Sequence, residues 1–127
     1  MRYLLDTCAW IFLLTDSEQL SNEQKKAILD PNNTIYISVV SAWEIALKMS
    51  KGKLELPNSL DVLIFESCIK DGYKILDLDV FSVLNTQNLP NHHKDPFDRM
   101  LISQAIDNDL VIITTDTKFS LYEVHLI

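Results

Sequence analysis

The sequence predicts an α/β fold in which a central, mainly parallel sheet of four to five strands is covered by helices on both faces. Short apolar runs alternate with helix-forming segments along all 127 residues, which is typical of βαβ units. The runs are rich in branched and aromatic residues, as expected for strands buried on both sides. No repeat, low-complexity tract or long linker divides the chain, so we expect a single domain over residues 1–127.

The predicted elements follow one another in a regular order. The expected strands are residues 2–6, 34–38, 73–79 and 110–115, with residues 124–127 as an edge strand. The expected helices are residues 7–14, 21–30, 41–52, 58–72, 79–90 and 95–109. Ser21 is a typical N-cap, and Gly52 and Gly72 are typical residues at helix ends.

Composition indicates a soluble protein with no membrane association. Apolar residues make up 47% of the chain and charged residues 23%, which are ordinary proportions for a globular domain. The start of the chain carries Asp6 and does not resemble a signal peptide, and the longest apolar run, residues 9–14, is too short to span a bilayer. Cys8 and Cys68 lack any ligand-like spacing, so we expect reduced thiols in a cytoplasmic protein.

The formal net charge of −7 lowers the expectation of nucleic-acid binding, because such proteins usually carry a basic stripe. That objection weakens if several of the acids share a metal site. Bound divalent cations would invert the local electric field at such a site. Acidity therefore does not exclude a nucleic-acid substrate.

Four acids stand at related places in the predicted fold. Asp6 and Asp116 end strands, whereas Glu44 and Asp98 fall in the first turns of predicted helices. In an open parallel sheet, strand carboxyl ends and the following helix starts gather at one edge, where ligands bind. Carboxylates gathered there would repel one another by about 1–4 kcal/mol per pair near a surface. Mg²⁺ or Mn²⁺ relieves such repulsion with hard oxygen ligands, so the pattern predicts a metal site.

Each acid taken alone also fits ordinary helix chemistry. Ser41 and Glu44 match a capping box, and acids in first turns favour the helix dipole. Asp95 before Pro96 is a good N-cap, so we expect it to support the site. Side chains in a helix tilt toward its start, so we expect Asp98 to direct its carboxylate to the site and to bind the metal.

Two other groups of residues complete these expectations. His92 and His93 are adjacent in a polar loop, and we expect both to be solvated and to form no zinc site. Lys48, Arg99 and Lys118 lie near the acids and are candidates to hold a substrate backbone, with Arg99 the best placed.

The motifs LLDT (residues 4–7), SVVSAWEIALK (38–48), HKDPFDRMLISQA (93–105) and ITTDTKF (113–119) resemble the PIN-domain ribonucleases. The likeness is greatest to VapC-like toxins of prokaryotic type II toxin–antitoxin systems, and it runs from residue 3 to the C-terminus. It implies a three-layer α/β/α sandwich. It also implies homodimers and a cognate antitoxin that inserts a segment near the active site.

The resemblance also implies the residues of the site. It assigns the catalytic and metal-binding acids to Asp6, Glu44, Asp98 and Asp116, which would hold one or two Mg²⁺ or Mn²⁺ ions per subunit. The family's small hydroxyl residues are matched by Thr7 and by either Thr114 or Thr115, and we expect Thr115 to position a water. Whether Asp95 also contributes to the metal site stays open.

The expected function is that of a metal-dependent endoribonuclease, the toxin of a type II pair, which cleaves RNA phosphodiester bonds by metal-activated water. One alternative is a receiver-type or phosphatase-like Mg²⁺ domain with an aspartyl nucleophile, although LLDTCAW supplies only Asp6 where an acid pair or a D-x-D is needed. Another is a non-catalytic module of the same fold that binds a cation and holds a partner.

Overall fold

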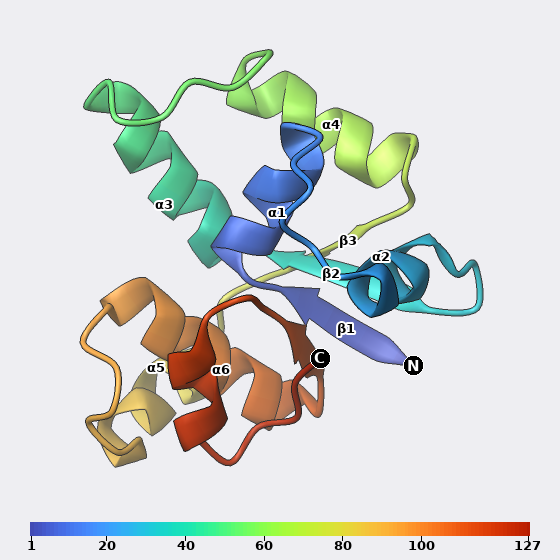
Figure 1. The fold of residues 1–127 in the computed structure, drawn as a ribbon. Helices are drawn as coiled ribbons and strands as arrows, with labels where there is room; N and C mark the ends of the chain where they lie inside the picture. Colours follow the sequence, from blue (N-terminus) through green and yellow to red (C-terminus); the bar gives the residue numbers. More distant parts are fainter.

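The computed structural model describes residues 1–127 and shows a parallel sheet between two layers of helices (Figure 1). The strands are β1 (Arg2–Leu5), β2 (Thr34–Ser38), β3 (Lys74–Leu76) and β4 (Val111–Ile113). Their order across the sheet is β3-β2-β1-β4, and all three pairings are parallel. The predicted α/β fold with a parallel sheet is confirmed.

The predicted edge strand at the C-terminus is present only as a short extension beside β4. Ile112 forms an isolated parallel bridge with Leu126, and its amide donates to the carbonyl of His125 at 2.8 Å. The carbonyl of Ile127 then accepts from the Thr114 amide at 3.3 Å and from the Gln24 side chain at 3.0 Å. The chain end is thus fastened to the sheet without forming a full strand.

Six α-helices and two short 3₁₀ helices connect the strands. They are α1 (Thr7–Leu14), α2 (Asn22–Leu29), α3 (Val39–Ser50), α4 (Leu60–Ile69), α5 (Val80–Asn85), η1 (Thr86–Asn88), α6 (Pro96–Asn108) and η2 (Thr117–Leu121). The N-cap predicted at Ser21 is confirmed, and it is part of a capping box in which the Ser21 and Gln24 side chains each accept from the other residue's amide. No helix has the length and apolar character needed to cross a membrane.

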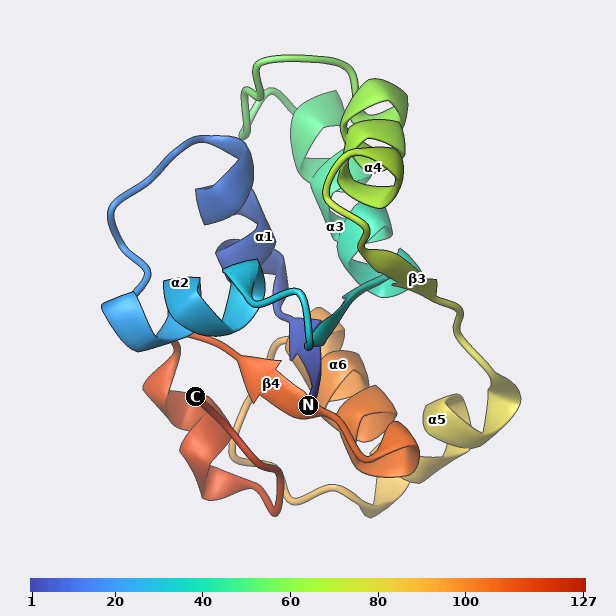
Figure 2. The same cartoon turned by 90° about the vertical axis from the view of Figure 1, so that its right-hand side faces the viewer.

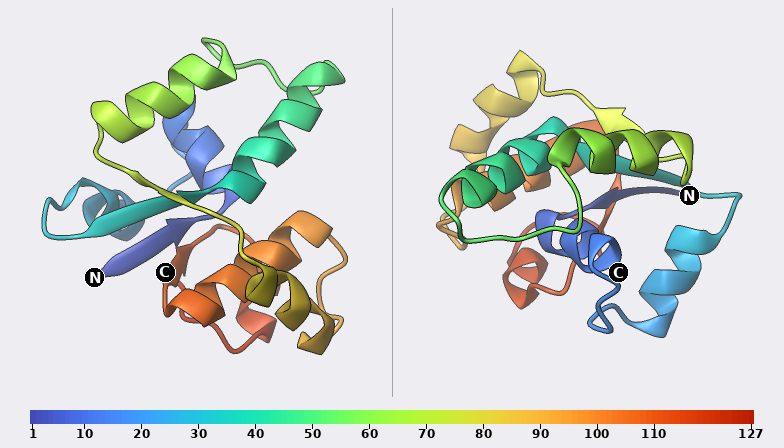
Figure 3. Two further views of the ribbon diagram at one scale, coloured as in Figure 1. Left: turned by 180° about the vertical axis from the view of Figure 1, so that it is seen from behind. Right: turned by 90° about the horizontal axis from the view of Figure 1, so that it is seen from above.

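Alternate residues of each strand feed two separate cores. Tyr3 and Leu5 point to the face where Trp10 of α1 and Ile45 of α3 pack. Leu4 points to the opposite face, against buried residues of α6 and η2, among them Leu101, Ile102 and Phe119. This period-two alternation places α1 to α4 on one side of the sheet and α5 with α6 on the other (Figures 1 and 2). On the first side α3 and α4 lie next to each other, as Figure 3 shows.

One helix begins earlier than the sequence predicted. The α3 helix starts at Val39 directly after β2, with Ser38 as its N-cap, and the Ser38 hydroxyl accepts from the Val40 amide at 3.0 Å. The expected capping box at Ser41 is therefore wrong, and Glu44 lies in the second turn rather than the first. The tertiary packing of Val40, which is buried, outweighs the weak helix preference of two consecutive valines.

Candidate metal centre

Asp6 lies where β1 ends and α1 begins. It is the N-cap of α1, and one oxygen, Oδ1, accepts from the Ala9 amide at 2.7 Å. The other oxygen, Oδ2, accepts from the hydroxyl of Thr114, which follows β4. Burial raises the pKa of Asp6 to about 6; the two hydrogen bonds oppose this rise, whereas the charges of Asp116 and Glu44 add to it. The carboxylate is thus held rigidly in a site that disfavours its charge.

Asp95 and Asp98 divide their work at the start of α6. Asp95 is the N-cap, as predicted: its Oδ1 accepts from the amides of Phe97 at 2.8 Å and of Asp98 at 3.2 Å. The carboxylate of Asp98 takes part in neither of these cap bonds. Burial, followed by repulsion from Asp95, raises the pKa of Asp98 to about 7, and Asp6 and Glu44 add to the rise. A cation nearby would reverse this preference and favour the ionised form.

Asp116 follows β4 and is the most exposed of the four acids, with 36% of its side chain accessible. Its Oδ1 accepts from the Lys118 amide at 2.9 Å, and its Oδ2 lies 3.0 Å from Nε2 of His93. Burial works to raise the pKa of Asp116. The Lys118 amide and His93 outweigh that effect, so the pKa lies below its ordinary value and Asp116 stays ionised.

Glu44 projects from α3 and carries the one buried side-chain polar atom without a hydrogen-bond partner. Its Oε2 pairs with Nζ of Lys48 at 3.0 Å, whereas its Oε1 is buried and accepts from no group. An unsatisfied buried acceptor costs about 1–3 kcal/mol, and more when charged. Such an oxygen is a fitting ligand for a hard cation, which would supply the missing partner.

His93 belongs to this centre, although the sequence reasoning placed it in solvent. His92 is exposed as expected, but His93 is only 8% exposed. Its Nε2 lies 3.0 Å from Oδ2 of Asp98 and 3.0 Å from Oδ2 of Asp116, and these three atoms lie within 4.8 Å of one another. No local sequence signal could have found it, because its burial depends on tertiary contacts of the loop before α6 with Phe119 and Tyr122.

The threonines are placed differently from one another. Thr7 is buried and donates to the hydroxyl of Ser41 at 3.0 Å, so it joins α1 to α3. Thr114 is buried and donates to Asp6, whereas Thr115 is exposed. Of the two threonines that follow β4, the structure therefore brings Thr114 to the acids and leaves the predicted Thr115 facing solvent.

The three basic candidates also differ in what they contact. Arg99 donates to the carbonyls of Pro90 at 2.8 Å and of Thr86 at 2.9 Å, so its guanidinium fastens the loop before α6 instead of facing a substrate. Lys48 is paired with Glu44, and Lys118 is exposed beside Asp116. Arg99 is thus bonded to the chain's own carbonyls, whereas Lys48 and Lys118 lie next to the acids, and their binding of a substrate stays a prediction.

The four acids form one electrostatic group and provide ligands suited to a hard ion. The pKa values of Asp6 and Asp98 are both raised in part by other members of the group. The surroundings of these two carboxylates therefore disfavour their ionised form, and a third acid, Glu44, has an unpaired buried oxygen. Oxygen donors of this kind suit Mg²⁺ or Mn²⁺ better than softer metals, so the residues present fit the expected ion.

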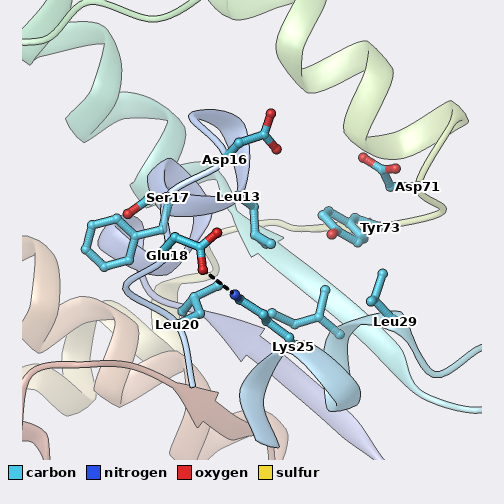
Figure 4. A pocket seen from close by; sticks show the side chains of 11 residues that line it. Leu13, Asp16, Ser17, Glu18, Leu20, Lys25, Leu29, Asp71 and Tyr73 are labelled. Carbon is cyan, nitrogen blue, oxygen red and sulfur yellow. Dashed lines mark ion pairs between the residues drawn. The ribbon is translucent and has the colours of Figure 1, made fainter. Parts of the chain in front are cut away.

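A separate hollow of about 400 Å³ lies away from these acids (Figure 4). Leu13, Leu29 and Tyr73 line it, and Lys25 pairs with Glu18 across it at 3.6 Å. Because Tyr73 precedes β3, this hollow is near the amino ends of the strands, whereas the acids follow the carboxyl ends. It contains none of the four acids and is not the centre of their chemistry.

Comparisons with known proteins agree with this architecture. The family model of the PIN domain matches residues 3–124. No curated protein sequence matches the chain.

Solved structures match the whole chain at low sequence identity. VapBC2 from Rickettsia felis, bound to a DNA fragment from its promoter, matches with a TM-score of 0.76 and 20% identity over 100% of this chain and 98% of that one. DNA-bound VapBC from Salmonella typhimurium gives 0.70 and 17%, over 100% and 97%. VapBC-5 from Mycobacterium tuberculosis, a member of the VapBC family of toxin-antitoxin systems, gives 0.62 and 19%, over 99% and 97%. These likenesses show a shared fold.

Proposed function

Because this chain belongs to the PIN domain family, we propose that it is a metal-dependent endoribonuclease and the toxin of a type II toxin–antitoxin pair. The observation that carries the proposal is the acid group at the carboxyl edge of the sheet. It includes a buried Glu44 oxygen without a partner and two carboxylates whose pKa values are raised. Grouped carboxylates of this kind add no stability to a sheet, whereas a divalent cation uses their oxygens as ligands.

Asp6, Glu44, Asp98 and Asp116 would hold one or two Mg²⁺ or Mn²⁺ ions. When bound, such an ion lowers the pKa of water into the range of an effective nucleophile and offsets the charge that develops on a phosphodiester during cleavage. The Ala9 amide and the Thr114 hydroxyl each donate to one oxygen of Asp6 and so orient its carboxylate. Lys48 holds Glu44 Oε2, whereas Oε1 has no protein partner and is available as a ligand.

An aromatic pair beside the acids supports RNA as the substrate. Trp43 precedes Glu44 and is 61% exposed, and its ring meets that of Phe97 edge to face at 5.1 Å. An exposed tryptophan gives a base a surface on which to stack, at about 1–3 kcal/mol per base. Lys118, exposed beside Asp116, is available to contact a phosphate.

We also propose that the protein is cytoplasmic, forms a homodimer and is inhibited by a cognate antitoxin. Structural neighbours include VapBC complexes from a toxin-antitoxin family, which supports the antitoxin. The α5 helix exposes Val80, Phe81 and Leu84, an apolar surface that a protein partner could cover. Light scattering of the purified protein would report the dimer.

The test is cleavage of a mixed RNA pool by protein purified free of any antitoxin. We expect cleavage with Mg²⁺ or Mn²⁺, none in EDTA, and none from an Asp98→Asn variant that still folds. The matched control is Asp109→Asn, which changes an acid at the far end of the same helix and should leave cleavage intact. Tight cation binding without cleavage of any RNA would contradict the nuclease proposal and favour a non-catalytic partner-binding module.

A further inference from the structure

The His93 ring is held on several sides. Its Nδ1 accepts from the Asp95 amide at 3.1 Å. The ring also forms a T-shaped pair with the Phe119 ring, with centroids 5.9 Å apart. The backbone amide of His93 donates to the Tyr122 hydroxyl at 2.7 Å. With 8% of the residue exposed, the ring has little freedom to turn. The direction of each ring nitrogen is therefore a fixed property of the fold.

The Asp95 contact determines which nitrogen carries the proton. A backbone amide can only donate, so Nδ1 must present a lone pair to it and carries no hydrogen. In the neutral ring the hydrogen is then on Nε2, the nitrogen that faces Asp116 and Asp98. A histidine that binds metal shows the opposite arrangement, in which its second nitrogen donates to a carbonyl or carboxylate.

The hydrogen on Nε2 lies between two of the proposed metal ligands. Nε2 makes a hydrogen bond to Oδ2 of Asp116 at 3.0 Å, and Oδ2 of Asp98 lies 3.0 Å from the same nitrogen. The same ring nitrogen therefore lies against two carboxylates that would otherwise repel each other. Its hydrogen is donated to Oδ2 of Asp116, while Oδ2 of Asp98 lies at ion-pair distance and Oδ1 of Asp98 has no protein partner.

We propose that His93 is a positioning residue of the metal centre and not a ligand: its Nε2–H fixes the spacing and orientation of Asp98 and Asp116 for the ion. This inference rests on the proposed function only in requiring that the acids bind a divalent cation. It does not depend on RNA being cut.

The tautomer can be measured directly in the metal-free protein. Two-bond ¹H–¹⁵N correlation spectra of ¹⁵N-labelled protein at pH 8 distinguish a protonated ring nitrogen from an unprotonated one. We expect His93 to show hydrogen on Nε2 and none on Nδ1. The opposite tautomer would overturn the proposal, because it would free the Nε2 lone pair for a metal.

Three substitutions then separate the donated hydrogen bond from the ring itself. Glutamine places an amide N–H as many bonds from Cα as Nε2 of histidine, asparagine places it at the Nδ1 position, and alanine has neither. We expect Mn²⁺ affinity, measured by calorimetry, to fall about 10–100-fold in His93→Ala and His93→Asn, as for other residues that orient metal ligands. His93→Gln should remain close to the unsubstituted protein. Equal affinity in all three, or a Gln variant as weak as Ala, would overturn the proposal.

The bound Mn²⁺ ion provides an independent readout. Electron spin-echo envelope modulation detects a nitrogen nucleus bonded directly to Mn²⁺. We expect no such nitrogen signal, either from protein with natural ¹⁴N or from ¹⁵N-labelled protein. A directly coordinated nitrogen that disappears in His93→Gln would make His93 a ligand and overturn its positioning role. Mn²⁺ binding without RNA cleavage would remove the proposed function alone, whereas failure of the acids to bind Mn²⁺ would remove both.

Discussion

Asp98 is subject to two opposing demands in a single side chain. Burial and the neighbouring Asp95 raise its pKa to about 7, so in the metal-free protein it is partly protonated near neutrality. A divalent cation needs the ionised form. Metal binding by this carboxylate should therefore release a proton, and the release should be largest below pH 7.

The raised pKa values make the stability of the metal-free protein depend on pH. The pKa values of Asp6 and Asp98 are about 6 and about 7 in the folded chain, above the ordinary value of 3.8. Between about pH 4 and pH 7, the folded state therefore binds more protons than the unfolded state. Their contribution to stability is thus complete below about pH 4 and is lost as the pH rises to 7. In EDTA, we expect Tm to fall from pH 5 to pH 8.

Asp98→Asn should flatten this fall and raise Tm at pH 8 by several degrees, because it removes a charge that costs on the order of 1–4 kcal/mol beside its neighbours. Asp109→Asn, with no part in the acid group, should leave the slope unchanged. A variant whose Tm falls as steeply as that of the unsubstituted protein would show that Asp98 is not held at a raised pKa.

Thr114 and Thr115 provide a matched pair of substitutions one residue apart. Thr114→Val keeps the shape of the side chain but removes the hydroxyl that donates to Asp6, leaving a buried carboxylate oxygen unpaired. We expect Mn²⁺ affinity to fall about 10–100-fold, as when other groups that orient metal ligands are removed. Thr115→Val changes an exposed side chain and should have no measurable effect. Equal losses in both variants would contradict this assignment.

Among the elements, the start of α6 contains one acid that caps the helix, Asp95, and one that is proposed to bind the metal, Asp98. Asp95 caps the helix, so Asp95→Ala should lower the free energy of unfolding by about 0.5–2 kcal/mol. Asp95→Asn, which retains an accepting oxygen, should lose much less. Urea unfolding at pH 8 in EDTA measures both. If Asn were as damaging as Ala, the charge of Asp95 rather than its cap bonds would be what stabilises the helix.

The ends of α6 and α3 show what a sequence can and cannot predict. Asp95-Pro96 carries its own start signal, since the cap oxygen and the fixed proline φ act within one turn, and the helix begins where predicted. The S-x-x-E signal at Ser41 is equally local but misleading. Packing of Val40 in the core extends α3 back to Val39, and Thr7 uses the Ser41 hydroxyl. A capping signal in the sequence predicts a helix start only where no tertiary contact competes with it.

The same reasoning explains which site residues were found. Acids at strand ends follow from the order of strands and helices, so Asp6 and Asp116 could be placed at one edge of the sheet from sequence. His93 could not, because its burial depends on how the loop of residues 89–95 folds over Phe119 and Tyr122. The choice of Thr114 over Thr115 depends on where β4 ends, and strand ends are poorly determined by composition.

For the whole molecule, a bound ion should act as a stabilising link between distant segments. A ligand that binds only the folded state at about 100 times its dissociation constant adds about 2.7 kcal/mol to the free energy of unfolding. We expect Mn²⁺ to raise Tm at pH 8 and EDTA to reverse the rise. Asp98→Asn should lose most of this increase. A rise in Tm that is equal in the variant would place the bound Mn²⁺ elsewhere.

The four acids at positions 6, 44, 98 and 116 come from segments spread over nearly the whole chain, and the loop of residues 51–59, most of which is exposed, separates the first two from the last two. A gene divided at this loop would encode two halves, each with two of the four carboxylates and neither with a complete centre. Under the proposed nuclease function, neither half alone would cleave RNA in a living cell. Fused to two proteins of interest, the halves would regain a complete centre only where those proteins meet, so cleavage would record an encounter between them.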